Sequence, residues 1–445
     1  MLAACRVCAC PEPELLHASP HEQTLTSESK LRRGRLKIHL CANCAHVMSD
    51  EGGLVDVASY YGAEYDSLLD SLEADDLYDL DAGGQPVYRS QVQLDNLVRL
   101  ANLPAKGRVL DFGCGKGAFL ARFQRQYPGW ELAGCDVSER YRAFVEPLTG
   151  AGRFRVTSLE GAEAPGDGFD LVTMFFVAEH LVEPAATLTR VASLLGPAGL
   201  LYLTVPNVMT NTIDAFLADH LSHFSALSLA ALVHRAGLRP LVVSEHHQLG
   251  QLTLMAAPDP AVSGRPLARL GGDLVAAYAA AIRAGVARWA QCGARLEAFL
   301  RQRPADHRGL AVYGAGVFGS YLTLSAGPTR EAITCYLDQN PFKVGKTHLD
   351  RPVVHPREIP DDVTDVLVGL SPGRARTILA QAGLLARPGL GSSGRDGRRA
   401  WACARRQAGP APAVSPRRPA DGHHLAARPG AAARRPVERR RVRPA

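Results

Sequence analysis

Four cysteines near the N-terminus form two pairs whose spacing is typical of a metal site. Cys5 and Cys8 make one C-x-x-C pair, and Cys41 and Cys44 make the second. In each pair two thiolates converge from a tight turn at the separation that tetrahedral zinc requires, and two pairs complete a four-sulfur site. Because four protein ligands leave no open coordination position, we expect a structural zinc ion here rather than a catalytic one.

The segment between the two cysteine pairs is polar and basic. This segment, which includes residues 32–39 (RRGRLKIH), predicts a short hairpin whose core is too small to fold unaided, so a bound metal would supply its stability. Cys10 and His46 lie nearby in the sequence as alternative ligands, but the paired spacing favours the four thiols named above.

A glycine-rich turn in the central part of the chain marks a candidate cofactor site. An apolar strand over residues 108–112 is followed by Gly113, Gly115 and Gly117, and then by an amphipathic helix. Glycine lets the backbone turn sharply and approach a ligand where a Cβ atom would clash. Asp111, at the end of the strand, can accept hydrogen bonds from a ligand ammonium group or anchor the loop.

A second acidic residue ends the next predicted strand. Asp136 follows Gly117 by nineteen residues and closes the segment 131–136 (ELAGCD). A carboxylate at the carboxyl edge of the neighbouring strand can hold two ribose hydroxyls. Strands and helices continue to alternate up to residue 207, which predicts a parallel sheet covered by helices on both faces, with the ligand at the carboxyl ends of its strands.

The order and spacing of these motifs over residues 90–245 resemble the class I S-adenosylmethionine-dependent methyltransferases. The resemblance rests on residues 111–117 (DFGCGKG), Asp136, 169–172 (FDLV), 179–184 (EHLVEP) and 203–207 (LTVPN). It implies a Rossmann-like α/β core that binds S-adenosylmethionine. The residues implied in cofactor binding are Asp111, Phe112, Gly113, Gly115 and Gly117 along the methionine part, Asp136 at the ribose, and Glu160 beside the adenine.

A second resemblance narrows the family. The paired cysteines, the methyltransferase core and a third, C-terminal domain are similar to the sugar C-methyltransferases that act on nucleotide-linked deoxysugars. Those enzymes carry a Glu-His-x-x-Tyr-Phe-Ser motif that supplies the base, and residues 219–225 here read DHLSHFS. Asp219 replaces the Glu and His223 replaces the Tyr, whereas His220 is kept, so His220 is the first candidate for the general base.

The same residues suit carbon methylation on chemical grounds. Removal of a proton beside a carbonyl makes an enolate, which attacks the activated methyl group of the cofactor. A histidine whose pKa is near ambient pH suits this task, and a neighbouring carboxylate such as Asp219 can orient it. The alternative is that His220 and His223 only cap or pack the helix predicted over residues 226–236. His180 is expected to have a structural role.

A second glycine fingerprint lies in the C-terminal part of the chain. Gly314, Gly316 and Gly319 form G-x-G-x-x-G, and Asp338 ends a strand nineteen residues later, which alone is a dinucleotide-binding signature. Residues 338–345 (DQNPFKVG) resemble an element of the small Rossmann-like C-terminal domain of the sugar C-methyltransferases. We therefore interpret this domain as a wall of the substrate cleft rather than as a catalytic NAD site.

The chain has 445 residues, too many for a single hydrophobic core, and several domains are expected. We predict a zinc-binding module over 1–55, a methyltransferase core with a leading helical segment over 56–260, a bridging helix and small Rossmann-like domain over 261–386, and a disordered tail over 387–445. The tail holds fifteen arginines and three acidic residues, a balance of +12, so the remaining 386 residues carry −6 of the overall +6. The net charge therefore describes the tail and says nothing about the substrate.

Composition also bears on partners and location. The chain has no run of eighteen apolar residues and no signal-peptide pattern at its start, so we expect a cytoplasmic protein without a membrane partner. The negative charge of residues 1–386 disfavours nucleic acid as a partner. The sequence favours a small polar substrate, most plausibly a nucleotide-linked sugar. Two alternatives stay open: O- or N-methylation of another metabolite, and an RNA-modifying enzyme that uses the zinc ribbon for binding.

Overall fold

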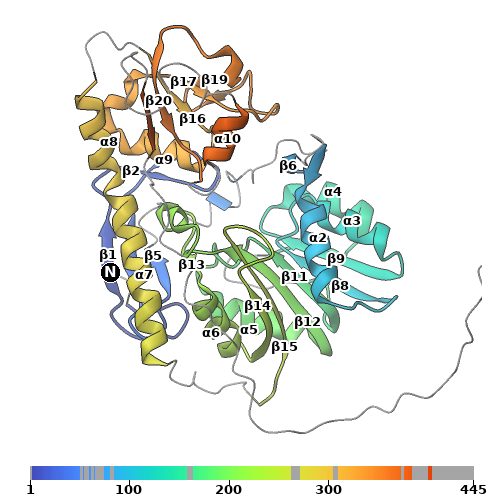
Figure 1. Cartoon of the computed structure of the whole chain (residues 1–445). Coiled ribbons are helices and arrows are strands. Elements are labelled where there is room, and N and C mark those ends of the chain that lie inside the picture. Colours follow the sequence, from blue (N-terminus) through green and yellow to red (C-terminus); the bar gives the residue numbers. More distant parts are fainter. Residues whose placement is uncertain are drawn as a thin grey trace, which may run out of the picture. The chain divides into compact units, whose positions relative to one another are not determined.

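Three larger β-sheets organise the part of the chain that the computed structural model describes (Figure 1). The described residues are 3–50, 54, 60–61, 65, 75–80, 85–157, 164–261, 271–303, 309–371, 375–382 and 399–402. Every helix within these residues is too short or too polar to cross a lipid bilayer.

The central sheet has seven strands in the order β10-β9-β8-β11-β12-β15-β14. Its strands are β8 (Gly107–Phe112), β9 (Trp130–Asp136), β10 (Phe154–Val156), β11 (Phe169–Phe175), β12 (Leu195–Pro206), β14 (Leu238–Ser244) and β15 (Gln251–Pro258). All neighbours pair in parallel except β15, which runs antiparallel to both β12 and β14. The strand order reverses between β8 and β11, which is the position where an open α/β sheet binds its ligand.

Helices cover both faces of this sheet, as the alternation of strands and helices predicts. The helices are α2 (Arg89–Leu100), α3 (Ala118–Gln126) and α4 (Arg142–Thr149) on one face, and α5 (Pro184–Leu194) and α6 (Ala226–Arg235) on the other. Val109 packs in the first cluster and Leu110 in the second, because successive side chains of a strand point to opposite faces. The strands are thus buried on both sides.

The N-terminal module contains a four-stranded sheet in the order β1-β4-β5-β13. Its strands are β1 (Glu14–Ala18), β4 (Lys37–Leu40), β5 (Val47–Ser49) and β13 (Ser222–His223), and the last of these comes from the far end of the methyltransferase core. A separate hairpin pairs β2 (Gln23–Leu25) with β3 (Leu31–Arg33). The segment between the cysteine pairs thus contains the short hairpin that the sequence predicts, formed by β2 and β3, whereas β4 belongs to the four-stranded sheet.

The C-terminal sheet has the order β18-β19-β17-β16-β20-β21. Its strands are β16 (Gly309–Tyr313), β17 (Ile333–Leu337), β18 (Thr347–His348), β19 (Arg351–Val354), β20 (Val363–Val368) and β21 (Arg399–Ala402), with α9 (Val317–Ser325) and α10 (Ala375–Gln381). Only β18 pairs antiparallel. The predicted bridging helix is two helices, α7 (Gly272–Ala290) and α8 (Cys292–Arg301).

The tail predicted to be disordered over residues 387–445 lies outside the described residues except at β21. There, Arg399–Ala402 pair in parallel with β20 and extend the C-terminal sheet, so the expectation of disorder does not hold for these four residues. One further hairpin, β6 (Leu77–Leu80) with β7 (Pro86–Tyr88), precedes α2.

Candidate functional site

The glycine loop between β8 and α3 adopts the backbone conformation that its sequence predicts. Gly113, Gly115 and Gly117 have φ values of +80°, +50° and +79°, in the left-handed region that side chains with a Cβ atom rarely adopt. A Cβ atom on Gly113 would lie 2.4 Å from the Cγ2 atom of Val177. The loop can therefore pass close to a ligand only because these positions are glycine.

Replacing Gly113 with alanine is expected to destabilise the protein by about 1–3 kcal/mol from backbone strain alone, with a further cost from the overlap with Val177. Thermal unfolding measures this effect. Gly272→Ala is the matched control, because a Cβ atom there would meet nothing within 4 Å. Equal melting temperatures for the two variants would contradict the assigned role of Gly113.

Asp136 ends β9 and turns its carboxylate toward the glycine loop. Its Oδ2 atom accepts a hydrogen bond from the Gly115 N–H at 2.8 Å, and its Oδ1 atom accepts one from the Ser138 N–H at 3.2 Å. Burial raises the pKa of Asp136, whereas these backbone donors oppose that rise. Each carboxylate oxygen has a second lone pair, so Asp136 can still accept hydrogen bonds from two hydroxyls of a ligand.

One cavity collects most of the predicted cofactor residues. Asp111, Phe112, Gly113, Gly115 and Asp136 line it, together with Tyr61, Tyr65, Tyr141, Phe176 and His180. Gly117 does not line it but precedes α3, where a Cβ atom would approach Leu148 and Val145. Glu160, predicted to border the adenine, lies outside the described residues.

Asp111 is a buried acid at the floor of this cavity. The Thr173 hydroxyl donates to its Oδ1 atom at 2.7 Å. Burial is the largest influence and raises the pKa of Asp111 to about 7, although the hydrogen bond from Thr173 opposes it. A cationic group placed in the cavity would favour the ionised form of this carboxyl group.

The segment before α2 adds charged residues to the cavity edge that the sequence did not predict. Asp75 and Asp76 both line the cavity. The Lys116 ammonium group, from the glycine loop, lies 2.8 Å from Asp76 Oδ1, and the Arg122 guanidinium group lies 3.3 Å from Asp75 Oδ2. These ion pairs connect the segment before β6 to the glycine loop and to α3.

A single carboxylate holds both histidines that the sequence proposed for catalysis. His220 Nδ1 lies 2.6 Å from Asp214 Oδ1, and His223 Nδ1 lies 2.9 Å from Asp214 Oδ2. All three side chains are buried. Asp214 lies six residues before His220 in a 3₁₀ turn (Thr212–Phe216), a spacing that no local pattern connects with a histidine pair.

Asp219 does not orient His220 as predicted. Its carboxylate instead accepts hydrogen bonds from the Ser27 N–H at 2.8 Å, the Ser27 hydroxyl at 2.5 Å and the Tyr61 hydroxyl at 3.2 Å. Asp219 therefore ties the core to the N-terminal module and to the tyrosine at the cavity.

His180, expected to be structural, is the histidine that lines the cavity. Its Nδ1 atom lies 3.1 Å from the Asp219 carbonyl oxygen and also contacts the Tyr61 hydroxyl. In the neutral imidazole, an N–H at Nδ1 leaves the lone pair on Nε2. The ring of His220 packs edge-on against that of His180, with the centroids 4.7 Å apart.

The environment separates the pKa values of these two histidines. Burial lowers the pKa of His220, but the Asp214 carboxylate outweighs burial and raises it to about 10. Burial and the charge of His220 together lower the pKa of His180 to about 4. The Asp214 carboxylate thus favours the protonated form of His220, which disfavours the predicted role of general base, whereas burial favours the neutral form of His180. Neighbouring groups with separated pKa values are typical of an acid and base pair.

Glu179 adds a buried acid to the same cluster. Burial raises the pKa of Glu179 to about 8, although the nearby His220 opposes that rise. The Oε2 atom of Glu179 has no hydrogen-bond partner among the described residues.

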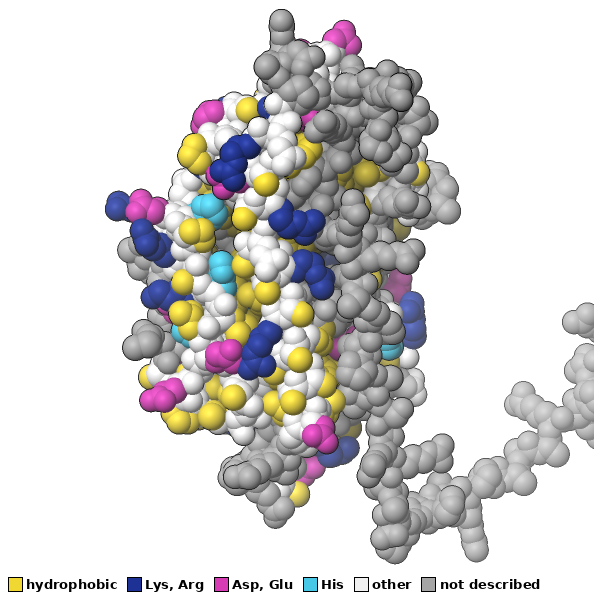
Figure 2. Space-filling model, turned by 60° about the vertical axis from the view of Figure 1, so that its left-hand side comes forward, with side chains coloured by type: hydrophobic (Ala, Val, Ile, Leu, Met, Phe, Trp, Pro, Cys, Tyr) yellow, Lys and Arg dark blue, Asp and Glu magenta, His cyan; other side chains and the backbone are white. Residues whose placement is uncertain are grey.

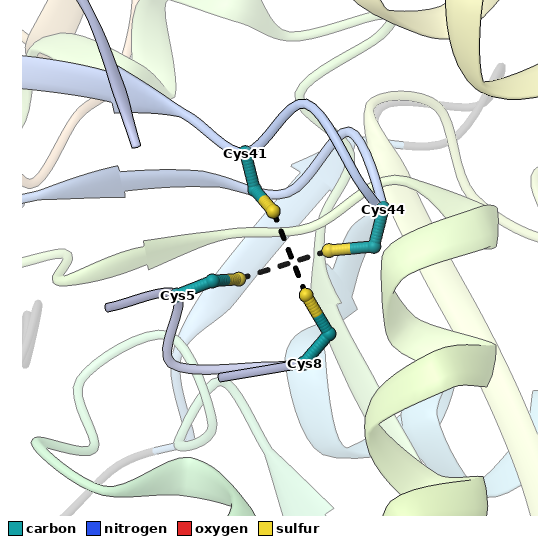
Figure 3. A group of neighbouring side chains, drawn as sticks. All are labelled: Cys5, Cys8, Cys41 and Cys44. Atoms are coloured by element: carbon teal, nitrogen blue, oxygen red, sulfur yellow. Dashed lines mark hydrogen bonds between the residues drawn. The ribbon is translucent and has the colours of Figure 1, made fainter. Parts of the chain in front are cut away.

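The four predicted zinc ligands come together (Figure 3). Cys5 Sγ lies 3.7 Å from Cys44 Sγ, and Cys8 Sγ lies 3.5 Å from Cys41 Sγ. Four sulfur atoms around zinc at about 2.3 Å would be about 3.8 Å apart, so the arrangement fits a closed tetrahedral site. The cysteine cluster is compatible with a zinc module.

The loop of the second glycine fingerprint is hydrogen-bonded to groups of its own domain. Asp338 Oδ2 accepts a hydrogen bond from the Ala315 N–H at 2.9 Å, and its Oδ1 atom accepts one from the Asn340 N–H at 2.9 Å. The Lys343 ammonium group donates to the Ala315 carbonyl oxygen at 2.8 Å. Asp338 thus anchors its loop in the same way that Asp136 anchors the first one.

The strand order of the central sheet, its one antiparallel strand and the glycine loop after β8 define the class I methyltransferase fold. In agreement with this fold, residues 88–243 match the family model described as a methyltransferase domain. That match begins before β8 and ends within β14. It therefore leaves out β15, the N-terminal module and the C-terminal sheet.

The relatives and solved structures described next are similar to only part of the chain. The ubiquinone biosynthesis O-methyltransferase of Xanthomonas campestris pv. campestris is 35% identical over 136 residues, which are 29% of this chain and 56% of that protein. The chain therefore spans about half the length of the curated relatives it matches. A complex of the Haloferax volcanii Trm112 methyltransferase activator with a methyltransferase is 17% identical, with a TM-score of 0.34 over 38% of this chain and 91% of that one. A Burkholderia thailandensis 1,6-didemethyltoxoflavin-N1-methyltransferase is 20% identical, with a TM-score of 0.31 over 38% of this chain and 76% of that one.

Proposed function

We propose that this chain transfers the methyl group of S-adenosylmethionine to a small polar metabolite. The observation that carries the proposal is the cavity at the switch point of the central sheet, where the glycine loop, Asp136 and His180 meet. The match of residues 88–243 to a methyltransferase domain supports it.

Asp136, Asp111 and the glycine loop would hold the cofactor. When bound, S-adenosylmethionine supplies an activated methyl group on a positively charged sulfur. Asp136 accepts hydrogen bonds from the two ribose hydroxyls, and Asp111 lies where a carboxylate can accept hydrogen bonds from the ammonium group. Gly113 and Gly115 keep the backbone free of side chains at the closest approach. Glu160 remains the predicted neighbour of the adenine.

His180 would accept the substrate proton, and His220 would supply a fixed positive charge behind it. A neutral imidazole can take a proton from the substrate, and general base catalysis of this kind contributes about 10²–10⁴-fold. The imidazolium of His220, held by Asp214, stabilises negative charge that develops nearby. His223 and Asp219 would support the pair, because His223 holds Asp214 and Asp219 holds Tyr61.

The substrate class that we favour is a nucleotide-linked sugar, methylated on carbon. The three-part chain and residues 219–225 resemble the enzymes of that class. Carbon methylation also suits a neutral base beside a cation, because the base removes the proton next to a carbonyl and the cation stabilises the enolate.

O-methylation of a small molecule is the second candidate. The curated relatives of the core are named as O-methyltransferases, and His180 could equally take the proton of a hydroxyl. Carbon NMR of the product made with ¹³C-methyl-labelled cofactor separates the two candidates, because carbon-bound and oxygen-bound methyl groups resonate far apart.

The RNA alternative receives no support from the face shown in Figure 2. Basic and acidic side chains are interspersed on the described part of that face. Arg283 of α7 pairs with Glu14 of β1 at 2.5 Å. Phosphate binding instead needs clustered basic residues.

The cysteine cluster would hold a structural zinc ion. The four thiols belong to two tight turns, and three of them are buried. Because every coordination position would be filled by sulfur, the metal would stabilise the module and take no part in methyl transfer.

Replacing Asp136 with alanine is expected to weaken the binding of S-adenosylhomocysteine about 100-fold, the equivalent of ~3 kcal/mol for the lost charged hydrogen bonds. Isothermal titration calorimetry measures this affinity. Asp95→Ala removes an exposed acid of α2 and serves as the control. Equal affinity in wild type and Asp136→Ala would reject the ribose role of Asp136.

A further inference from the structure

The last strand of the N-terminal sheet carries a residue of the proposed catalytic cluster. β13 pairs antiparallel with β5, with Ser222 opposite Met48 and His223 opposite Val47. Because β5 follows Cys44 by only three residues, the strand that holds His223 is built onto the cysteine module. The position of His223 therefore depends on residues more than 170 positions earlier in the chain.

Arg6, between the first two cysteines, fastens this strand pair from one end. Its Nη1 atom donates to the carbonyl oxygens of Ser49 and Leu221, each at 2.6 Å. One carbonyl belongs to the end of β5 and the other to the residue before β13. The side chain of Arg6 is buried, so these charged hydrogen bonds are sheltered from water.

Ser49 then reaches the imidazole of His223. The Ser49 hydroxyl lies 3.0 Å from His223 Nε2, while His223 Nδ1 lies 2.9 Å from Asp214 Oδ2. When Ser49 donates its proton to Nε2, the neutral imidazole must carry its own proton on Nδ1 and direct it at Asp214. The other oxygen of Asp214 contacts His220.

We propose that Ser49 and Arg6 of the N-terminal module are positioning residues for methyl transfer, which act by fixing His223 and Asp214 and thereby the ring of His220. The inference rests on the proposed function of the core. Neither residue lines the cofactor cavity, so neither touches cofactor or substrate there. The N-terminal module would then form part of the active site and would not be a separate domain.

Loss of the Ser49 hydroxyl is expected to change which ring nitrogen of His223 carries the proton. Without a donor at Nε2, the tautomer with its proton on Nε2 becomes accessible, and its bare Nδ1 repels Asp214. Charged and titratable groups that face His220 are Asp214, Asp219, Glu179, His180 and His223, with Arg6 facing His223 from the module. Of these, Asp214 is the group that Ser49 controls through His223.

The test measures the ionisation of His220 directly by NMR of the full chain labelled with ¹⁵N-histidine. The signal of His220 is assigned by its loss in His220→Gln. In Ser49→Ala, the ionisation of His220 should move down by about one pH unit, a tenfold change in its protonation equilibrium, and Ser49→Thr should restore it. Arg6→Gln should change it in the same direction, while the affinity for S-adenosylhomocysteine stays at the wild-type value.

Ser222→Ala is the matched control for Ser49→Ala. Ser222 is also buried and lies in β13 itself, but its hydroxyl has no hydrogen-bond partner among the described residues. An unchanged His220 ionisation in Ser49→Ala, or an equal change in Ser222→Ala, would overturn the inference. If wild type binds no S-adenosylhomocysteine, the proposed function fails instead, so the two failures are distinguishable.

Discussion

Substitution of His220 by alanine is expected to lower the rate of methyl transfer by about 10²–10⁴-fold while leaving the affinity for S-adenosylhomocysteine unchanged. The Asp214 carboxylate favours the protonated form of His220, whose ring packs against His180 without lining the cavity. Removing it takes away the charge that stabilises the developing anion but leaves the cofactor contacts intact.

The measurement is turnover with a nucleotide-linked sugar carrying a carbonyl group, beside calorimetry with S-adenosylhomocysteine. His246→Ala is the control, because His246 is exposed and outside the cluster. Undiminished turnover in His220→Ala would exclude His220 from catalysis.

The pH dependence of the rate should reflect the ionisation of both His180 and His220. Because the pKa of His220 is raised to about 10, its positive charge is present below that pH and lost above it. Because the pKa of His180 is lowered to about 4, this base is available above that pH and protonated below it. The rate should thus fall at both extremes. In Asp214→Asn the alkaline fall should move to lower pH, since burial then lowers the pKa of His220 without the Asp214 carboxylate to oppose it.

Substitution of Cys41 by serine is expected to remove the metal and unfold the N-terminal module. Structural zinc contributes about 10–16 kcal/mol of apparent folding free energy in small domains, far more than a module of this size can replace. Metal analysis should find about one zinc ion per wild-type chain and none in the variant. Hydrogen exchange of residues 3–50 should rise to the level of an unfolded segment.

Cys335→Ser is the matched control for the metal experiment. Cys335 is likewise a buried free thiol, but it lies in β17 of the C-terminal sheet. It should keep the zinc and the slow exchange of the module. A wild-type chain that is folded and free of metal would contradict the assignment of the four cysteines.

Local patterns were sufficient to predict the conformation of the glycine loop. The three glycines of residues 113–117 need a positive φ, and the sequence offers no other reason for their spacing. Asp136 was predictable because a βα unit has a nearly fixed length, so an acid nineteen residues after Gly117 falls at the next strand end. The cysteine pairs were predictable for a similar reason, since C-x-x-C is itself a local geometry.

The histidine cluster around Asp214 was predictable only in part, because its contacts join distant segments. Asp219 is next to His220 in sequence, yet it binds Ser27, 192 positions earlier. Asp214 is the carboxylate that holds His220, and its approach depends on a 3₁₀ turn that has no sequence signature. The place of His180 in the cavity was not predictable, because its contacts with Asp219 and Tyr61 depend on tertiary packing.

The binding of ¹⁴C-methyl-labelled S-adenosylmethionine to the wild-type chain, counted by equilibrium dialysis, tests whether the cavity between β8 and β11 holds this cofactor. We expect one molecule bound per chain, displaced by S-adenosylhomocysteine and unaffected by NAD. Absence of binding, or displacement by NAD, would contradict the assignment of the cavity between β8 and β11 to S-adenosylmethionine.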